Sequence, residues 1–358
     1  MNLRGAVLLA GVAIVLAFKP VGSQELIWSA NYGGQFNDNG YAGQRAGDGG
    51  YILLGSTYSF GSGGFDFYLL KVSPAGDTLW TKTFGGAATD IGYDVAVTAD
   101  GGFIMVGSTR SLGAGGKDVY LIRADSTGAV LWEKNYGGSG QDEGRSIRQT
   151  SDNGFIICGT TSSYGSGYDD VYFIRTDSIG DTVWTTTVGG GGGESGSAVR
   201  QTADGGFIAV GSTGSFGDGY SSLYAIRLNA NGDSVWTAVY GGGGADFGYA
   251  LEITPDQGFI FSGGTASFSA GYTDAYLVKT DAGGNVEWEK SYGGAFDDRA
   301  YAVMRAMDGG YLLVGTTESF GAAMIDLYLI KTNPVGDTVW TRRYGGSQSD
   351  YGQAVFRE

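Results

Sequence analysis

The amino-acid sequence predicts an all-β protein assembled from one repeated unit. Glycine contributes 68 of 358 residues and recurs in fixed columns, as expected of turns. No sustained helical periodicity follows the first 23 residues. All tryptophans are spaced by 52 residues, a period that indicates a repeat architecture. They are Trp28, Trp80, Trp132, Trp184, Trp236, Trp288 and Trp340.

One unit of the repeat contains four short segments with strand character. Between Trp80 and Trp132 these segments are predicted over residues 78–84, 93–98, 103–106 and 118–123. The turn Asp100-Gly101-Gly102 separates the second segment from the third, and such turns favour tight hairpins because their central positions require positive φ. The same aspartate recurs at Asp48, Asp152, Asp204, Asp256 and Asp308.

Four antiparallel strands in a unit of this length are typical of a β-propeller blade. Blades arranged around an axis leave only short, protected sheet edges. Trp80 and Phe84 are four residues apart on one strand and therefore face the same side. We predict that the tryptophan column has a structural role, as the wedge between neighbouring blades.

The count of strands leaves the closure of the ring open. A leading strand over 26–32 and a final strand over 351–356 flank six complete units. The sequence thus holds one more copy of the innermost and outermost strands than of the two middle strands. We favour a seven-bladed design that lacks two strands over a six-bladed ring with surplus terminal strands. Truncation of a longer gene product would explain the shortfall.

The first 23 residues have the pattern of a secretory signal peptide. Arg4 precedes an apolar run over residues 5–18, and a short polar stretch offers a cleavage position after Ser23. This run is too short to span a bilayer comfortably, which argues against membrane insertion. We therefore expect residues 24–358 to form a single propeller domain that is secreted, displayed at the cell surface or periplasmic.

Several motifs of the repeat resemble known sequences. Asp-Gly-Gly-Phe-Ile-x-Val-Gly-Ser-Thr, Asp-x-Tyr-Leu-Ile-Arg and Gly-Asp-Thr-Val-Trp, followed by Tyr-Gly-Gly, are similar to the β-propeller repeats of secreted bacterial proteins, which are often attached to sorting or adhesion modules. This resemblance implies a fold rather than an activity. Asp177, Gly180 and Trp184 also resemble the tryptophan-docking motif of quinoprotein dehydrogenases, but with one residue fewer between Asp and Gly and no separate cofactor signature.

The composition excludes several kinds of chemistry. The chain has no histidine and a single cysteine, so Ser-His-Asp and Cys-His catalysis, histidine-ligated metals, thiolate clusters and an intramolecular disulfide are ruled out. Cys158 occupies a column of mostly small apolar residues and is predicted to be buried. The net charge of -15 argues against binding to nucleic acid or anionic membranes.

Two columns of charged residues recur with the repeat. A basic column on the fourth predicted segment, expected in exposed or inter-blade ion pairs, comprises Lys71, Arg123, Arg175, Arg227, Lys279 and Lys331. An acidic column just before the second segment comprises Asp38, Asp90, Asp142, Glu194, Asp246, Asp298 and Asp350. We favour turn stabilisation for the acidic column. A ring at one mouth of the central channel, attracting a basic ligand or a cation such as calcium, is the alternative.

The sequence therefore predicts a non-catalytic binding or scaffold module for an unidentified extracellular protein or polysaccharide. It identifies no catalytic residue, no metal ligands and no cofactor, apart from the calcium hypothesis. The competing hypothesis is an enzyme, either a quinone-dependent dehydrogenase or a hydrolase that uses a carboxylate pair. A catalytic pair would be expected to break the symmetry of the repeat.

Overall fold

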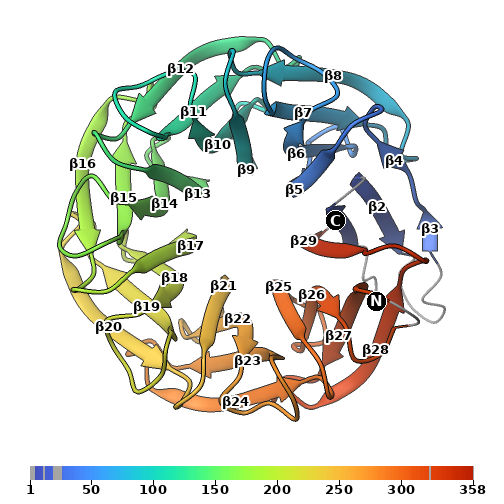
Figure 1. Ribbon diagram of the computed structural model, residues 1–358, viewed down its shortest axis with the longest axis vertical. Helices are drawn as coiled ribbons and strands as arrows, with labels where there is room; N and C mark the ends of the chain where they lie inside the picture. Colours follow the sequence, from blue (N-terminus) through green and yellow to red (C-terminus); the bar gives the residue numbers. More distant parts are fainter. Residues whose placement is uncertain (1–4, 11–12, 19–25, 322–323, 358) are drawn as a thin grey trace.

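The protein is a ring of β-sheets around a central channel (Figure 1). The computed structural model describes residues 5–10, 13–18, 26–321 and 324–357. Every regular element in these ranges is a β-strand. Accordingly, no helix in the described part of the chain is of a kind that could cross a membrane.

Six blades each consist of four antiparallel strands from one repeat. The first strand of each blade lines the channel and the fourth lies at the circumference (Figure 1). In chain order the blades are β5 (Asp38–Arg45), β6 (Tyr51–Thr57), β7 (Asp66–Val72) and β8 (Thr78–Phe84); β9 (Asp90–Val97), β10 (Phe103–Thr109), β11 (Asp118–Ala124) and β12 (Val130–Tyr136); β13 (Asp142–Gln149), β14 (Phe155–Thr161), β15 (Asp170–Thr176) and β16 (Thr182–Val188); β17 (Glu194–Gln201), β18 (Phe207–Thr213), β19 (Ser222–Leu228) and β20 (Ser234–Tyr240); β21 (Asp246–Ile253), β22 (Phe259–Thr265), β23 (Asp274–Thr280) and β24 (Val286–Tyr292); and β25 (Asp298–Arg305), β26 (Tyr311–Thr317), β27 (Asp326–Thr332) and β28 (Thr338–Tyr344).

The two ends of the chain meet in a separate sheet between the first and sixth blades (Figure 1). Its strand order is β29 (Tyr351–Arg357), β1 (Gly5–Ala10), β2 (Ala13–Phe18) and β3 (Leu26–Trp28), and β4 (Asn31–Tyr32) also pairs with β2. Residues 5–10 and 13–18 thus lie where the sequence analysis expected two strands to be missing. The cleavage position after Ser23 lies outside the described residues, and the signal peptide stays a prediction.

The preference for a seven-bladed design lacking two strands is therefore wrong. The structure has six four-stranded blades, and the remaining sector is filled by the composite five-stranded sheet. The error has a physical origin. The sequence count treated the two ends of the chain as parts of one more four-stranded blade, whereas β29 pairs with β1 and both β3 and β4 pair with β2, so this sheet is not a blade of the repeated kind.

The innermost strand of each blade begins earlier than the sequence predicted. Strand β9 starts at Asp90 rather than Tyr93, and Gly92 pairs with Gly107 of β10. A Cβ at Gly92 would lie 3.0 Å from side-chain atoms of Leu54 and Phe67 in the preceding blade. Gly92 therefore permits close packing between blades and does not mark a turn.

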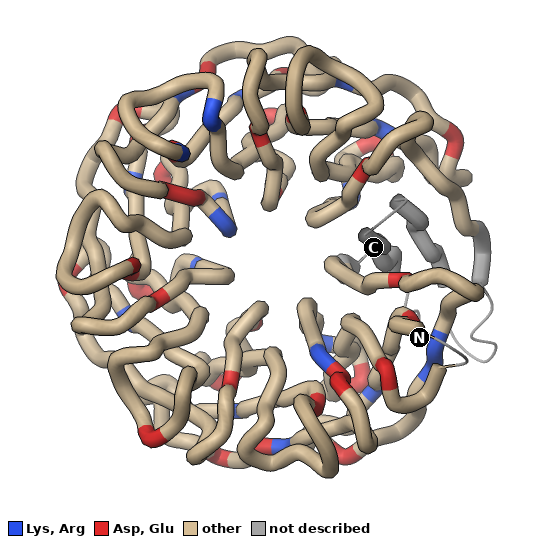
Figure 2. Tube along the Cα trace, viewed as in Figure 1, with Lys and Arg blue, Asp and Glu red and all other residues tan. Residues whose placement is uncertain are grey.

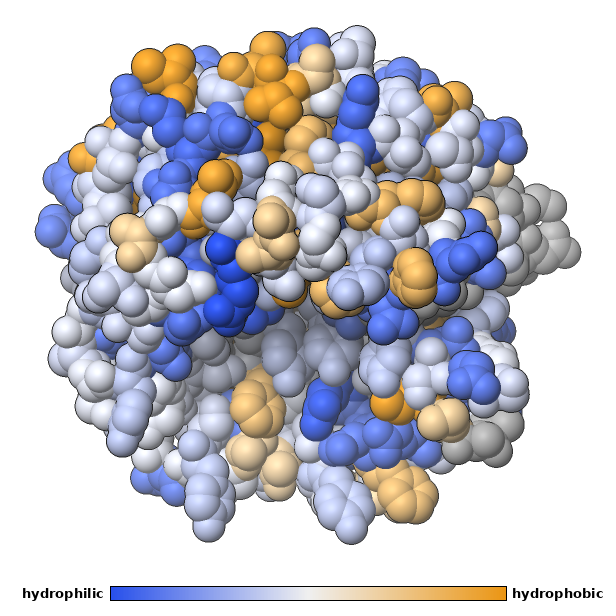
Figure 3. Space-filling view, turned by 45° about the horizontal axis from the view of Figure 1, so that its top comes forward, coloured by the Kyte–Doolittle hydropathy of each residue, from blue (hydrophilic) through white to orange (hydrophobic). Residues whose placement is uncertain are grey.

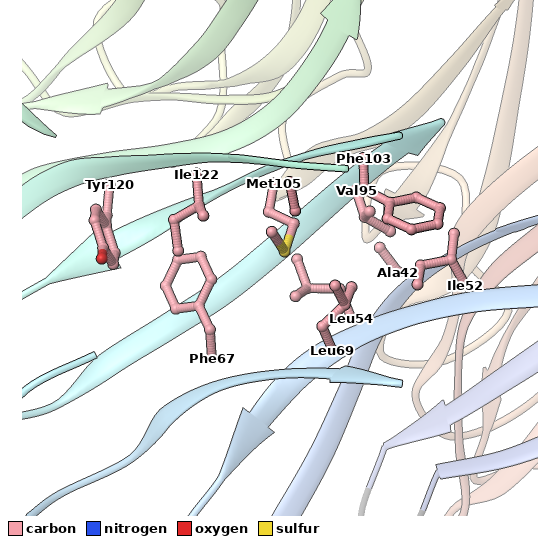
Figure 4. Close-up of a cluster of buried hydrophobic side chains, with 11 residues drawn as sticks. Ala42, Ile52, Leu54, Phe67, Leu69, Val95, Phe103, Met105, Tyr120 and Ile122 are labelled. Atoms are coloured by element: carbon pink, nitrogen blue, oxygen red, sulfur yellow. The ribbon is translucent and has the colours of Figure 1, made fainter. Parts of the chain in front are cut away.

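The hydrophobic core consists of clusters between successive blades. One cluster, shown in Figure 4, joins Ala42, Ile52 and Leu54 of the first blade to Val95 and Met105 of the second, among others. An equivalent cluster between the third and fourth blades contains Cys158, which is fully buried as its column predicted. Each blade thus shares its apolar faces with both neighbours.

Five of the tryptophans, from Trp80 to Trp288, lie at blade junctions against the turn between the third and fourth strands of the next blade. A Cβ on Gly180, which has φ +84, would lie 2.9 Å from the Trp132 ring. The same ring lies 6.0 Å from the ring of Phe155. Equivalent tryptophan–glycine contacts join Trp80 to Gly128, Trp184 to Gly232, Trp236 to Gly284 and Trp288 to Gly336.

A tyrosine on the fourth strand ties most junctions to the same turn. Tyr136 Oη donates a hydrogen bond to the carbonyl of Gly180 at 2.6 Å. Where Val188 replaces this tyrosine, the indole Nε1 of Trp184 instead donates to the carbonyl of Ala230 at 3.2 Å. The other tyrosine contacts are Tyr32 to Gly76 at 2.5 Å, Tyr240 to Gly284 at 2.8 Å and Tyr292 to Gly336 at 2.6 Å.

Replacing a central tryptophan is expected to destabilise the ring. Trp184→Ala should lower the free energy of unfolding by about 3 kcal/mol, since it removes ring contacts on both sides of a junction and leaves a cavity. Urea denaturation measures this loss. Tyr220→Ala, at a side chain that is 93% exposed, is the control and should change little. Equally small losses of stability at both positions would contradict the role of tryptophan as a wedge between blades.

Removing residues 1–23 is expected to weaken the sector in which the chain ends meet. Strand β29 pairs with β1, so the shortened chain leaves an unpaired edge on β29. Calorimetry should show a lower melting temperature, and limited proteolysis should begin in residues 351–357. A variant that lacks only the first four residues is the control. An unchanged melting temperature in the shorter chain would contradict the pairing.

Candidate functional site

The acidic column lies at the start of the channel-lining strands, with each carboxylate held inside its own loop region. Asp90 is fully buried and accepts hydrogen bonds from the Gly86 amide at 2.8 Å and the Ser111 hydroxyl at 2.7 Å. Glu194 makes equivalent bonds with the Gly190 amide at 2.6 Å and the Thr213 hydroxyl at 2.8 Å. The corresponding amide bonds for Asp38, Asp142, Asp246, Asp298 and Asp350 are 2.7, 2.8, 3.0, 2.9 and 2.9 Å.

A second buried aspartate faces most members of this column across the blade junction. Asp66, at the start of β7, lies opposite Asp90, and Gly85 fits between the two carboxylates. Burial first, and then the charge of Asp90, raise the pKa of Asp66. No group of three or more His, Cys, Asp or Glu residues suited to a metal ion occurs in the described ranges. The calcium and basic-ligand hypothesis for the acidic column therefore stays a prediction.

The basic column forms ion pairs within blades, so the expectation of exposed or inter-blade pairs is wrong. Arg123 is 5% exposed, and its Nη2 lies 2.6 Å from both carboxylate oxygens of Asp100 in the turn of the same blade. The turn between the first two strands folds back over the third, which the linear spacing does not reveal. Equivalent pairs join Lys71 to Asp48, Arg175 to Asp152, Arg227 to Asp204, Lys279 to Asp256 and Lys331 to Asp308.

A β-bulge in every channel-lining strand produces the candidate site. In the second blade Gly107 pairs with Gly92 and Val106 pairs with Asp94, which leaves Tyr93 without a partner residue on β10. A bulge redirects the side chain of its extra residue. The same irregularity recurs once in each innermost strand, β29 included. The resulting bulge column comprises Tyr41, Tyr93, Arg145, Ser197, Tyr249, Tyr301 and Gln353.

These seven side chains line a central cavity of about 480 Å³. The space-filling view shows this cavity as a hollow at the centre of the molecule (Figure 3). Its volume is within the usual range of sites for small molecules. The bulge column varies in chemistry from blade to blade, as does the partly exposed column that holds Asn39, Ile91 and Glu143, whereas the residue before each bulge is glycine in all but one strand. The variation within the bulge column gives the cavity an uneven lining.

Aromatic side chains of the bulge column form two groups around the channel. The Tyr41 and Tyr93 rings have centroids 5.6 Å apart, and Cζ of Arg145 lies 4.1 Å from the centroid of Tyr93. Across the channel, the Tyr249 and Tyr301 rings have centroids 5.0 Å apart. Around the ring, Ser197 lies between the two groups on one side and Gln353 lies between them on the other. The channel thus has two aromatic walls with polar residues between them.

Charged side chains line the same cavity beside the aromatic walls. Asp94 Oδ2 lies 2.5 Å from Nη1 of Arg148 and also accepts the Ile147 amide at 2.9 Å. Arg200 Nη2 lies 3.4 Å from Oε1 of Glu252. Burial, and then the nearby charge of Arg148, lower the pKa of Arg200 to about 10. Figure 2 shows basic residues on the innermost part of the ring in the sector of β13 and β17.

The bulge column was not recognised from the sequence. The signal was present, because seven positions spaced by 52 residues change from Tyr to Arg, Ser and Gln while their neighbours repeat. The repeat pattern drew attention to the conserved columns, and the bulge that points this column into the channel depends on pairing with a second strand. Catalytic residues were not predicted, and the cavity contains no histidine or cysteine.

Comparisons with known proteins show the fold and no more. Neither a protein family nor a curated protein matches the sequence. Among solved structures, the chain resembles an apocarotenoid oxygenase from Synechocystis (11% identity, TM-score 0.54, 99% of this chain and 93% of that one). It also resembles a protein of unknown function from Bacteroides caccae (11%, TM-score 0.50, 81% and 94%) and BamB from Moraxella catarrhalis (15%, TM-score 0.44, 96% and 88%). The similarity to the β-propeller repeats of secreted bacterial proteins therefore stays a resemblance.

The turn aspartates are expected to make stability sensitive to acid. Hydrogen bonding by Thr254, with a further contribution from Lys279, lowers the pKa of Asp256 from 3.8 to about 2. Because its folded pKa is depressed, this carboxylate stabilises the fold above pH 3.8, and its contribution is lost as the pH falls toward 2. Asp256→Asn should therefore flatten the pH dependence of unfolding between pH 4 and 2, measured by urea denaturation. Asp233→Asn, at a carboxylate outside this column, is the control.

Proposed function

We propose that this protein is a non-catalytic binding module that holds a saccharide in its central channel. The bulge column carries this proposal. Six blades repeat the same core, turn and junction residues, yet the side chains that enter the channel differ from blade to blade. These side chains converge on one cavity, and function resides in a few residues placed on a scaffold.

The lining of the channel suits a sugar. The C–H faces of a pyranose ring are apolar and pack against aromatic rings, which Tyr41 with Tyr93 and Tyr249 with Tyr301 supply on two sides. The hydroxyl groups of a sugar require both donors and acceptors, which guanidinium and carboxylate groups provide. A cavity of about 480 Å³ accommodates a short saccharide but not a folded protein.

The carboxylates of the channel support binding rather than hydrolysis. A carboxylate-pair glycosidase needs one carboxyl group with a raised pKa, so that it is protonated and donates to the leaving group. Asp94 lies against Arg148, and Glu252 lies near Arg200. Each carboxylate is thus held by a guanidinium partner, which supports a static hydrogen-bonding role for both acids.

Calorimetric titration with neutral oligosaccharides of two to six glucose, mannose, xylose or N-acetylglucosamine units tests the proposal. We expect micromolar to millimolar affinity for at least one series, and no release of shorter sugars on prolonged incubation. Tyr249→Ala combined with Tyr301→Ala removes one aromatic wall and should weaken this binding at least tenfold.

Val183→Ala, at an exposed position of the outer strand β16, is the matched control and should bind as the wild type does. Binding that survives removal of the aromatic wall would place the ligand elsewhere. Release of shorter sugars would establish the hydrolase alternative.

A further inference from the structure

One face of the ring displays protruding tyrosines in three successive blades. The loops between the second and third strands of the third, fourth and fifth blades carry Tyr168, Tyr220 and Tyr272 at equivalent positions. Their exposed fractions are 82%, 93% and 70%. The first two blades have Gly64 and Gly116 at this position. The three tyrosines therefore interrupt the repeat, as the bulge column does, but on an outer surface.

A second set of rings lies in the same loops, partly exposed and supported from below. Phe216 is 42% exposed, and its ring centroid lies 5.6 Å from that of Tyr224 in strand β19. Similar pairs occur in the neighbouring blades, at 5.7 Å for Tyr164 with Tyr172 and 5.9 Å for Phe268 with Tyr276. We call the six exposed rings of these three loops the aromatic crown: Tyr164, Tyr168, Phe216, Tyr220, Phe268 and Tyr272.

The crown is held in place by hydrogen bonds between blades. The Tyr168 amide donates to the carbonyl of Gly192 at 3.3 Å, and Asp169 forms an isolated bridge with Gly193, both in the loop before the next blade. Ser269 donates its hydroxyl to the carbonyl of Tyr272 at 2.9 Å. Loops fixed in this way lose little conformational freedom when a ligand binds.

The surroundings of the crown are polar and acidic. Small or polar residues separate the two rings along each loop: Gly-Ser-Gly in the third blade, Gly-Asp-Gly in the fourth and Ser-Ala-Gly in the fifth. Asp218 is exposed within the crown, and Glu318 is exposed in the corresponding loop of the sixth blade. The core of a protein interface is usually depleted of charged residues, whereas Asp218 lies within the crown. Exposed carboxylates also repel anionic polymers.

We infer that the aromatic crown docks a neutral polysaccharide. Each blade presents one protruding ring and one supported ring to the apolar face of a sugar unit, and the serine hydroxyls of the same loops lie within the reach of its hydroxyl groups. Three adjacent blades repeat this arrangement, so one long chain engages several weak contacts and binds more tightly than a short oligosaccharide. The crown is separate from the central channel and does not depend on the function proposed for it.

Retention on polysaccharides tests this inference. The purified full chain is applied to insoluble cellulose, xylan, mannan and chitin, and to gels that contain soluble mannan or the anionic polymer alginate. We expect retention by at least one neutral polymer and none by alginate. The triple variant Tyr168→Ser, Tyr220→Ser and Tyr272→Ser should reduce that retention at least tenfold without lowering the melting temperature.

Two control variants locate the binding surface. The first control removes three exposed apolar side chains from the outer strands and should bind as the wild type does. It combines Leu79→Ser, Leu131→Ser and Val183→Ser, at side chains that are 55%, 57% and 60% exposed. The channel variant with Tyr249 and Tyr301 replaced by alanine should also keep its retention. Lack of retention by every neutral polymer, equal retention by alginate, or full retention of the triple variant would overturn the inference. Loss in the channel variant alone would assign polymer binding to the channel.

Discussion

The junction between blades is the contact on which the rest of the structure depends. A glycine with positive φ in one blade receives the tryptophan of the preceding blade, and in most junctions a tyrosine donates a hydrogen bond to the carbonyl of the same glycine. A side chain at that glycine would be excluded both by its backbone conformation and by the indole ring. Because successive blades meet through these parts, partly buried tryptophans pack against the apolar clusters between blades.

The channel separates recognition from folding. A bulge places one extra residue in each innermost strand, so that its side chain is not needed for pairing with the next strand or for the core. Residues on either side of the bulge supply the pairing and packing, which explains why they repeat so closely. The extra residue is therefore free to vary, and it does so as tyrosine, arginine, serine and glutamine around one opening.

Much of the fold could be predicted from the 52-residue period, because the repeated residues act locally. Trp80 and its equivalents pack at blade junctions, and Asp100 and its equivalents form tight turns. The number of blades did not follow, since closure depends on which distant segment pairs with β29. The acidic column was expected just before the innermost strand, but Asp90 is the first residue of β9, and its burial against Gly86 and Ser111 results from loops that meet only in three dimensions. The bulge column and the aromatic crown were missed for a related reason. The bulge column and the three protruding tyrosines of the crown depart from the repeat, whereas the sequence analysis followed residues that obey it.

The sameness of the junctions has a consequence for how such a protein can change over generations. A duplicated or exchanged stretch of 52 codons inserts a whole blade whose two faces already fit any neighbour. Each exchange also transfers one channel residue and one surface loop as a set. New combinations of lining residues can therefore arise by shuffling complete units within the gene, without the sequence of compensating core substitutions that a less regular fold requires.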